Sequence, residues 1–186
     1  MTTISDNLQG LRARLAKACA EAGRDVNDVT LLAVSKTFGP EAVEQALAAG
    51  QRAFGENYIQ EGVEKVLALR GARPQAGIEW HCIGPVQSNK TRLVATHFDW
   101  VHSVDRLKTA QRLSEQRPEG LAPLQVCLQV NVDGGLNKSG VSPGELPDLA
   151  HAVAALPRLR LRGLMAIPEP SDDVAVQRAA FRKVRE

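Results

Sequence analysis

The sequence predicts an α/β fold of the (β/α)8 TIM-barrel type, with about six of the eight β/α units present. Short apolar runs alternate with segments of helical periodicity along the 186 residues. Polar residues follow nearly every apolar run, and the active sites of barrels collect at that end of the strands. A doubly wound sheet also fits the alternation, but no glycine-rich phosphate loop follows the first apolar run, which favours the barrel.

The elements are expected in a regular order. A helix begins near Ile4 and ends at Gly23, because apolar residues recur there at intervals of three or four. Residues 29–34 form a continuous apolar run, which predicts a strand buried on both faces. Further strands are expected at about 52–54, 78–83, 100–104, 124–132 and 159–167, the last interrupted by Gly163. Further helices are expected at about 40–49, 57–70, 88–95, 106–114, 143–156 and 172–186.

Several details of these helices are predicted as well. Asp105 is expected to cap the helix that follows it. Ser142 and Glu145 have the spacing of a capping box, although Pro147 also allows a helix that begins later. In the third helix, Leu67 is expected to face the core.

Composition limits the class of protein. A net charge of +2 and an aromatic content of 4% argue against a nucleic-acid partner. No apolar stretch approaches the roughly 20 residues that cross a membrane, and the polar N-terminus lacks the pattern of a signal peptide. The three cysteines are odd in number and lack metal-binding spacing, so we expect no disulfide, no structural zinc, no catalytic thiol and a location in the reducing cytoplasm.

Three residues could carry chemistry, and each has an ordinary structural alternative. Lys36 directly follows the first apolar run, and it is either a solvated surface lysine or a partly desolvated amine that attacks a carbonyl group. His81 lies within a strand, as a core histidine with one hydrogen-bonded nitrogen or as a site residue. Asn57 opens a helix, where it could cap the helix, contact a ligand, or do both.

Other signals are weaker. Residues 87–90 place amide, hydroxyl and ammonium groups at a helix start, where phosphates bind, and the loop at 138–140 is similar. Met165 ends the last expected strand, where a methionine is more often a core residue. The histidines lack the spacing of metal ligands, and no hydrolase signature is present. Glu56 and Asp133 follow strands but have no obvious partner in the sequence.

Five segments resemble the pyridoxal phosphate homeostasis protein family, and they occur in family order across essentially the whole chain. They are LLAVSKT (31–37), FGENYIQE (54–61), WHCIGPVQSNK (80–90), the segment 131–140 and RGLMAI (162–167). Five ordered segments of this length are far more specific than any one of them. The chain departs from the family in the loop at 133–136, which lacks the acidic residue expected near Gly135.

The resemblance implies a barrel like the N-terminal domain of alanine racemase, with pyridoxal 5′-phosphate held as a Schiff base on Lys36. Asn57, His81, Ile83 and Met165 would line the pocket around the cofactor ring. It further implies a non-catalytic, monomeric protein of intracellular vitamin B6 and amino-acid homeostasis. Its expected partners are the cofactor and pyridoxal-phosphate-dependent apo-enzymes, with no membrane and no nucleic acid.

A pyridoxal-phosphate-dependent amino-acid racemase is the alternative function. Racemisation needs a second acid–base group on the far side of the cofactor ring. In alanine racemases, this group is a tyrosine from the second domain of the partner subunit. The one tyrosine of this chain is Tyr58, and no second domain is expected, so the resemblance favours the carrier over the racemase.

Residues 1–186 are expected to form a single pyridoxal-phosphate-binding barrel domain that is incomplete at its C-terminus. Six strands cannot close a barrel that takes eight, and the helical pattern continues to Glu186 without a glycine or proline stop. The family's Ser-x-Gly-Met-Ser motif and Arg-x-Gly segment, which grip the cofactor phosphate and face its ring nitrogen, have no counterpart after Ile167. We therefore expect a longer polypeptide with two further β/α units.

Overall fold

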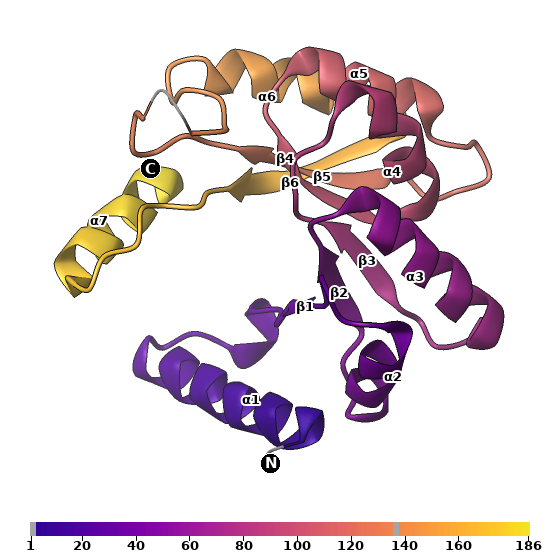
Figure 1. Cartoon of the computed structure of the whole chain (residues 1–186). Helices are drawn as coiled ribbons and strands as arrows, with labels where there is room; N and C mark the ends of the chain where they lie inside the picture. The colour runs from indigo at the N-terminus through magenta and orange to yellow at the C-terminus, as the bar shows by residue number, and fades with distance from the viewer. Residues whose placement is uncertain (1–2, 136–137) are drawn as a thin grey trace. The chain divides into compact units, whose positions relative to one another are not determined.

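The computed structural model describes residues 3–135 and 138–186. The chain forms two compact units, Met1–Trp80 and His81–Glu186, and strand β3 (Glu79–Cys82) spans the boundary between them. Short parallel strands alternate with helices in both units, as Figure 1 shows. This is the α/β organisation that the sequence predicts.

The first unit begins with a helix whose start is fixed by its own side chains. Its elements before β3 are α1 (Ile4–Glu21), η1 (Val26–Asp28), β1 (Ala33–Val34), α2 (Pro40–Ala48), β2 (Ala53–Glu56) and α3 (Ile59–Ala72). The hydroxyl of Thr3 accepts a hydrogen bond from the backbone N–H of Asp6, and the Asp6 carboxylate accepts one from the N–H of Thr3. Helix α1 buries Leu8 and Cys19, two residues of the predicted apolar stripe.

Strand β1 is much shorter than the strand expected at 29–34. It pairs in parallel with β2, with Val34 opposite Gly55. The side-chain amide of Gln51 donates a hydrogen bond of 2.7 Å to the carbonyl of Leu31, so a side chain satisfies this carbonyl in place of a neighbouring strand. Val34 is 46% exposed, and the expectation of burial on both faces is therefore wrong.

Helix α3 begins at Ile59 rather than near residue 57, and its buried face differs from the expected one. Leu67, which was expected to face the core, is 55% exposed, whereas Leu69 is buried. The buried face also includes Lys65, a charged residue that an apolar periodicity leaves out. The periodicity therefore predicts the helix and most of its buried face, since Ile59, Val63 and Val66 are buried, and it is wrong for Leu67.

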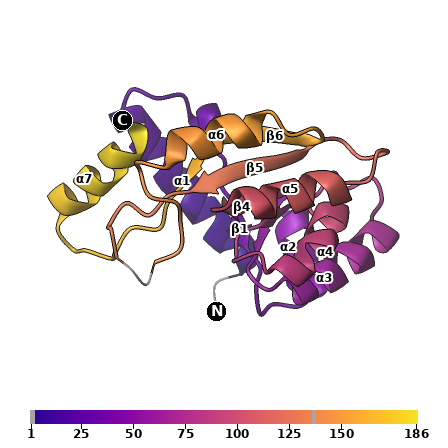
Figure 2. The same ribbon diagram turned by 90° about the horizontal axis from the view of Figure 1, so that it is seen from above.

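The second unit contains three further parallel strands. Its elements after β3 are η2 (Ser88–Lys90), α4 (Thr91–His97), β4 (Trp100–Val104), α5 (Leu107–Gln116), β5 (Leu124–Gln129), α6 (Leu146–Ala154), β6 (Leu159–Met165) and α7 (Val174–Arg185). The end of β3 pairs with β4, β4 with β5, and β5 with β6. Helices α4, α5 and α6 lie on the same side of β4–β6, whereas α7 lies beyond the carboxyl end of β6 (Figures 1 and 2). The fully buried side chains of this unit include Val101, Val104, Leu113, Leu124, Val126 and Leu128.

The starts of α5 and α6 differ from expectation in opposite ways. Arg106, and not Asp105, is the N-cap residue of α5, and the Asp105 carboxylate instead accepts a hydrogen bond of 3.2 Å from Nε of Arg106. The expected cap is therefore wrong. Helix α6 begins one residue before Pro147, so the later of the two possible starts is correct. Ser142 and Glu145 hydrogen-bond to each other ahead of this helix.

Gly163 marks a bulge in β6. Val126 of β5 lies opposite Leu161, and the next residue of β5, Cys127, lies opposite Gly163, so Arg162 is an extra residue in β6. Gly163 has a φ of 155°, which costs glycine little and other residues much more. The sequence correctly marks Gly163 as an irregular position, but β6 continues through it as one strand. Strand β5 ends at Gln129 rather than near residue 132.

Candidate functional site

Lys36 lies in a tight turn at the carboxyl end of β1. The backbone N–H of Phe38 donates a hydrogen bond of 3.1 Å to the carbonyl of Ser35, which closes a four-residue turn with Lys36 and Thr37 at its centre. Thr37 has a φ of 67°, a left-handed conformation that is uncommon for a β-branched residue. The side chain of Lys36 is exposed, so the structure shows the amine at the carboxyl end of a strand, as expected, without the expected desolvation.

A buried ion-pair network contacts the backbone of this turn. Nζ of Lys65 donates three hydrogen bonds, at 2.6 Å to the carbonyl of Ser35, at 2.8 Å to Oε1 of Glu56 and at 2.6 Å to Oε1 of Glu61. The Ser35 hydroxyl also donates to Oε1 of Glu56 at 2.6 Å, and the backbone N–H of Thr37 donates to Oε1 of Glu61 at 2.6 Å. The expectation that Glu56 lacks a partner is therefore wrong.

The charge state of Glu61 follows from this network. The hydrogen bond from Lys65 lowers the pKa of Glu61 below its usual value, so its carboxylate is ionised at neutral pH. The sequence pattern does not reveal the network, because Glu61 and Lys65 have the spacing of an ordinary surface pair on a helix. The one sign of the network in the sequence is that a charged residue, Lys65, lies between the inward positions Val63 and Val66 of α3.

Asn57 follows β2 at the position that corresponds to Lys36 after β1. The backbone N–H of Ser35 donates a hydrogen bond of 3.0 Å to the carbonyl of Gly55, which extends the pairing of β1 and β2 towards both residues. Asn57 does not cap α3, whose N-cap residue is Tyr58. Its Oδ1 atom is buried and has no hydrogen-bond partner among the described residues. A buried amide oxygen of this kind favours the ligand alternative over the cap.

His81 lies in the second unit, where it is packed among other rings. Its Nδ1 atom is 2.9 Å from Nε2 of His102, and its ring stacks on that of Trp100 with centroids 5.3 Å apart. The guanidinium of Arg162 lies over the same tryptophan at 5.1 Å. Burial, together with the charge that His102 would carry, lowers the pKa of His81 to about 3. The ring is therefore neutral at pH 7, as the core-histidine alternative requires.

Ile83 and Met165 lie at the ends of strands and are only partly buried. Ile83 comes directly after β3, and Met165 is the last residue of β6. The carbonyl of Met165 accepts a hydrogen bond of 2.9 Å from the backbone N–H of Val130. Both residues are half-buried, so neither is a core residue. Lys36 and Asn57, in contrast, lie in the first unit.

The structure gives little support to the two weaker phosphate-binding candidates, which are residues 87–90 and the loop at 138–140. Within 87–90, the short helix η2 has no side-chain cap at its start. Nζ of Lys138 lies 2.7 Å from Glu169 and 3.9 Å from Asp133, so this ammonium is paired with carboxylates. Asp133 therefore has a partner, contrary to expectation. The loop positions 136 and 137 of the family resemblance lie outside the described residues.

The three cysteines are free and buried. Burial raises the pKa of the Cys127 thiol, and the nearby charge of Arg162 opposes this shift. Burial has the larger effect, so the thiol stays protonated at neutral pH although Arg162 is near. Across residues 3–135 and 138–186, no three metal-ligating side chains gather as a site, and no helix there is long and apolar enough to cross a bilayer.

Comparison with known proteins shows which protein family this chain belongs to. Residues 7–186 match the family described as alanine racemase, N-terminal domain. The pyridoxal phosphate homeostasis protein of Pseudomonas aeruginosa is 59% identical over 186 residues, which are 100% of this chain and 79% of that protein. The Escherichia coli protein of the same name is 50% identical over 184 residues, which are 99% of this chain and 78% of that protein. The chain belongs to the pyridoxal phosphate homeostasis protein family.

Solved structures agree with this assignment. PipY of Synechococcus elongatus, solved with pyridoxal phosphate bound, is 34% identical with a TM-score of 0.76, and the match covers 92% of this chain and 78% of that one. Alanine racemase of Corynebacterium glutamicum is 20% identical with a TM-score of 0.60, over 93% of this chain and 46% of that one, which concerns the fold alone. The predicted family and the predicted alanine-racemase-type fold class are both confirmed.

Proposed function

We propose that this chain binds pyridoxal 5′-phosphate as a Schiff base on Lys36 and serves the intracellular homeostasis of vitamin B6 and amino acids without catalysing a reaction of its own. The observation that carries the proposal is the exposed amine of Lys36 on a fixed turn at the carboxyl end of β1. The family supports it, because relatives are named pyridoxal phosphate homeostasis proteins and PipY has been solved with pyridoxal phosphate bound.

The residues of the first unit suit this cofactor. A primary amine condenses with the aldehyde of pyridoxal phosphate, and one water molecule leaves as the C=N bond forms. Asn57 offers a buried amide oxygen, without a partner among the described residues, as an acceptor for a polar group of the ligand. Because neighbouring strands lie roughly 4.8 Å apart, residues that follow β1 and β2 at corresponding positions can contact one molecule.

We extend the proposal to His81, Ile83 and Met165 as further contacts of the cofactor, which is what the family resemblance implies. His81 is neutral at pH 7 and offers an aromatic surface rather than a charge. Ile83 and Met165 offer partly exposed apolar surface, and methionine adapts well to an aromatic partner. Their replacement by alanine, one at a time, should raise the Kd for the cofactor and leave the covalent attachment on Lys36.

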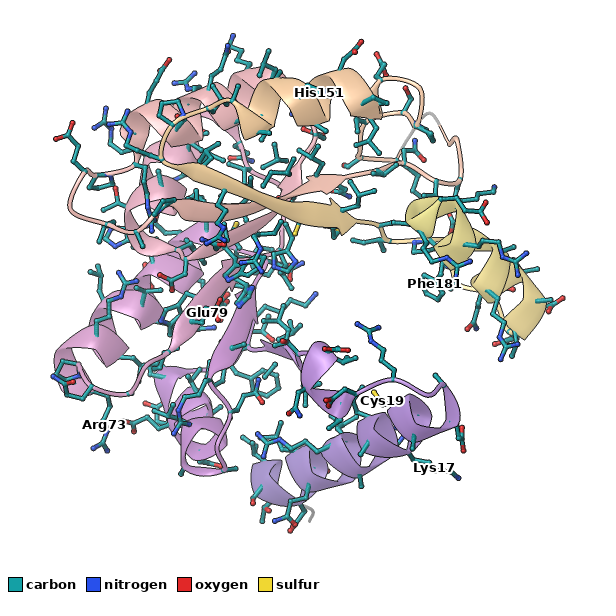
Figure 3. All side chains as sticks on the ribbon, turned by 180° about the vertical axis from the view of Figure 1, so that it is seen from behind. Lys17, Cys19, Arg73, Glu79, His151 and Phe181 are labelled. Atoms are coloured by element: carbon teal, nitrogen blue, oxygen red, sulfur yellow. The ribbon has the colours of Figure 1, made fainter. Side chains whose placement is uncertain are left out.

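The test is a titration with pyridoxal phosphate, followed by borohydride reduction and peptide mapping. The wild-type protein should gain the visible band of a protonated Schiff base, and reduction should fix the adduct on Lys36. Lys36→Ala should give no reducible adduct at the same occupancy. Lys17→Ala is the matched control, because Lys17 is an exposed lysine of α1 (Figure 3). An undiminished adduct in Lys36→Ala would show that another lysine is the site.

The absence of catalysis, the partners and the location need separate measurements. A racemase assay with several L-amino acids tests the alternative function, and turnover above about 1 per second would overturn the proposal of a carrier. Transfer of the cofactor to a pyridoxal-phosphate-dependent apo-enzyme, faster than release into solution, would support such enzymes as partners. Sedimentation tests the proposed monomer, and cell fractionation tests the proposed cytoplasmic location.

A further inference from the structure

We infer that Glu61 and Lys65 are positioning residues for Lys36, an inference that rests on the proposed Schiff base. These two side chains of α3 hold the backbone on both sides of the lysine. Nζ of Lys65 donates to the carbonyl of Ser35, the residue before Lys36, at 2.6 Å. Oε1 of Glu61 accepts from the backbone N–H of Thr37, the residue after it, at 2.6 Å. The turn that carries the amine is therefore fixed by α3 as well as by its own hydrogen bond.

The composition of the network favours positioning over simple stabilisation. Lys65 is 4% exposed and Glu56 is fully buried, and the removal of two charges from water offsets most of what their attraction contributes. Well-packed apolar side chains commonly stabilise a protein as much as such a pair does. Oε2 of Glu56 has no partner among the described residues, so the network is not optimised for stability.

The hydrogen bonds of the network hold the backbone beside Lys36 in one orientation. A lysine ammonium has three donors, and Lys65 uses all three, on Glu56, on Glu61 and on the carbonyl of Ser35. The Ser35 hydroxyl binds the same oxygen of Glu56, which fixes the residue before Lys36 a second time. Glu56 of β2, together with Glu61 and Lys65 of α3, thus holds the residues on either side of Lys36.

The backbone of Thr37 shows why this piece needs support. A β-branched residue at a φ of 67° is strained, and such a conformation persists only where the surroundings hold it. The bond from the N–H of Thr37 to Glu61 is such a constraint. The lysine side chain itself is long and flexible. With the turn fixed, fewer conformations of Lys36 are lost when its amine joins an aldehyde, so less free energy is spent on ordering.

The experiment compares Glu61→Ala with Glu64→Ala. Both changes remove one carboxylate from α3, and Glu64 is exposed. Glu61→Ala should weaken pyridoxal phosphate binding about tenfold, which corresponds to about 1.4 kcal/mol and is of the size of one hydrogen bond to a charged group. Glu64→Ala should bind as the wild type does. Glu61→Gln keeps an oxygen for the N–H of Thr37 and should recover most of the affinity.

Two measurements on the cofactor-free protein separate positioning from general damage. Hydrogen exchange of the Thr37 amide should accelerate in Glu61→Ala and stay slow in Glu61→Gln, since the amide loses its acceptor only in the first. Acetylation of Lys36 by acetic anhydride should be equal in all variants, because the amine remains exposed and reactive. The Glu61 side chain is 32% exposed, so its replacement leaves the fold intact, and thermal unfolding verifies this.

The outcomes distinguish this inference from the proposed function. Equal affinities of Glu61→Ala and Glu64→Ala, or no recovery in Glu61→Gln, would overturn the positioning role even when the adduct maps to Lys36. An adduct on a different lysine in the wild-type protein would instead refute the proposed function. Slow exchange of Thr37 in Glu61→Ala would show that the turn does not depend on α3 and would also overturn the inference.

Discussion

Acid should destabilise this protein through His81. The side chain is 5% exposed in β3, and burial is the main cause that lowers its pKa from 6.5 to about 3. The unfolded chain therefore takes up a proton on this ring at a higher pH than the folded chain does. The contribution of the neutral ring to stability is complete above about pH 6.5 and is lost as the pH falls from there towards 3.

The size of the effect follows from the two pKa values. Between pH 6 and pH 5, the unfolded-state ring falls from about one quarter neutral to about 3% neutral, while the folded-state ring stays neutral. The free energy of unfolding should drop by about 1.2 kcal/mol from His81 alone. Burial also lowers the pKa of His102, which adds to the loss. Glu61 titrates at lower pH, because its pKa lies below the usual value of 4.5.

The assay is urea unfolding of the cofactor-free protein at pH 6 and at pH 5. The wild type should lose about 1.2 kcal/mol more over this interval than His81→Asn does, since the variant lacks the titrating ring. His151→Asn is the matched substitution at an exposed histidine of α6 (Figure 3), outside the buried ring cluster. Equal losses in the wild type and in His81→Asn would refute the reasoning.

Two further substitutions test the packing within each unit. Lys65→Met should lower the free energy of unfolding by about 3–5 kcal/mol in urea unfolding, because the buried carboxylate of Glu56 loses its partner. The control Lys17→Met, on the surface, should change this free energy by less than about 0.5 kcal/mol. Gly140→Ala should cost about 2 kcal/mol or more in the same assay, because φ is 123° and a Cβ atom would lie 2.6 Å from the backbone nitrogen of Asn131. The matched change Gly144→Ala meets nothing within 4 Å and should be nearly neutral, so similar losses at both glycines would contradict this account.

Much of the fold follows from the spacing of apolar residues. The alternation of strands and helices is visible because continuous apolar runs alternate with segments of period 3.6, and a glycine inside an apolar run indicates the bulge at Gly163. Strand length is less predictable. The apolar run at 29–34 yields only a two-residue strand, since the Gln51 side chain, distant in sequence, bonds the carbonyl of Leu31.

The candidate site is likewise predictable only in part. Lys36 and Asn57 are predicted as candidates because they follow expected strands, where barrels collect their functional groups, and the structure places both just beyond β1 and β2. The partners of the lysine turn are not found, because Lys65 and Glu61 look like a surface pair and their burial depends on the orientation of α3. A pattern of apolar residues contains no information on where a charge is buried, and tertiary contacts decide it.

The bulge in β6 has a consequence for any transfer of this strand into another barrel. Side chains along a strand point alternately to its two faces, so one additional residue reverses the facing of every residue after it unless a bulge absorbs it. Arg162 is that additional residue, and Met165 comes three positions later. Because the bulge absorbs Arg162, Leu164 and Met165 stay opposite Leu128 and Gln129 of β5. A chimaera that threads β6 through a strand without a bulge would shift this register by one residue and place Leu164 on the face that Met165 now occupies.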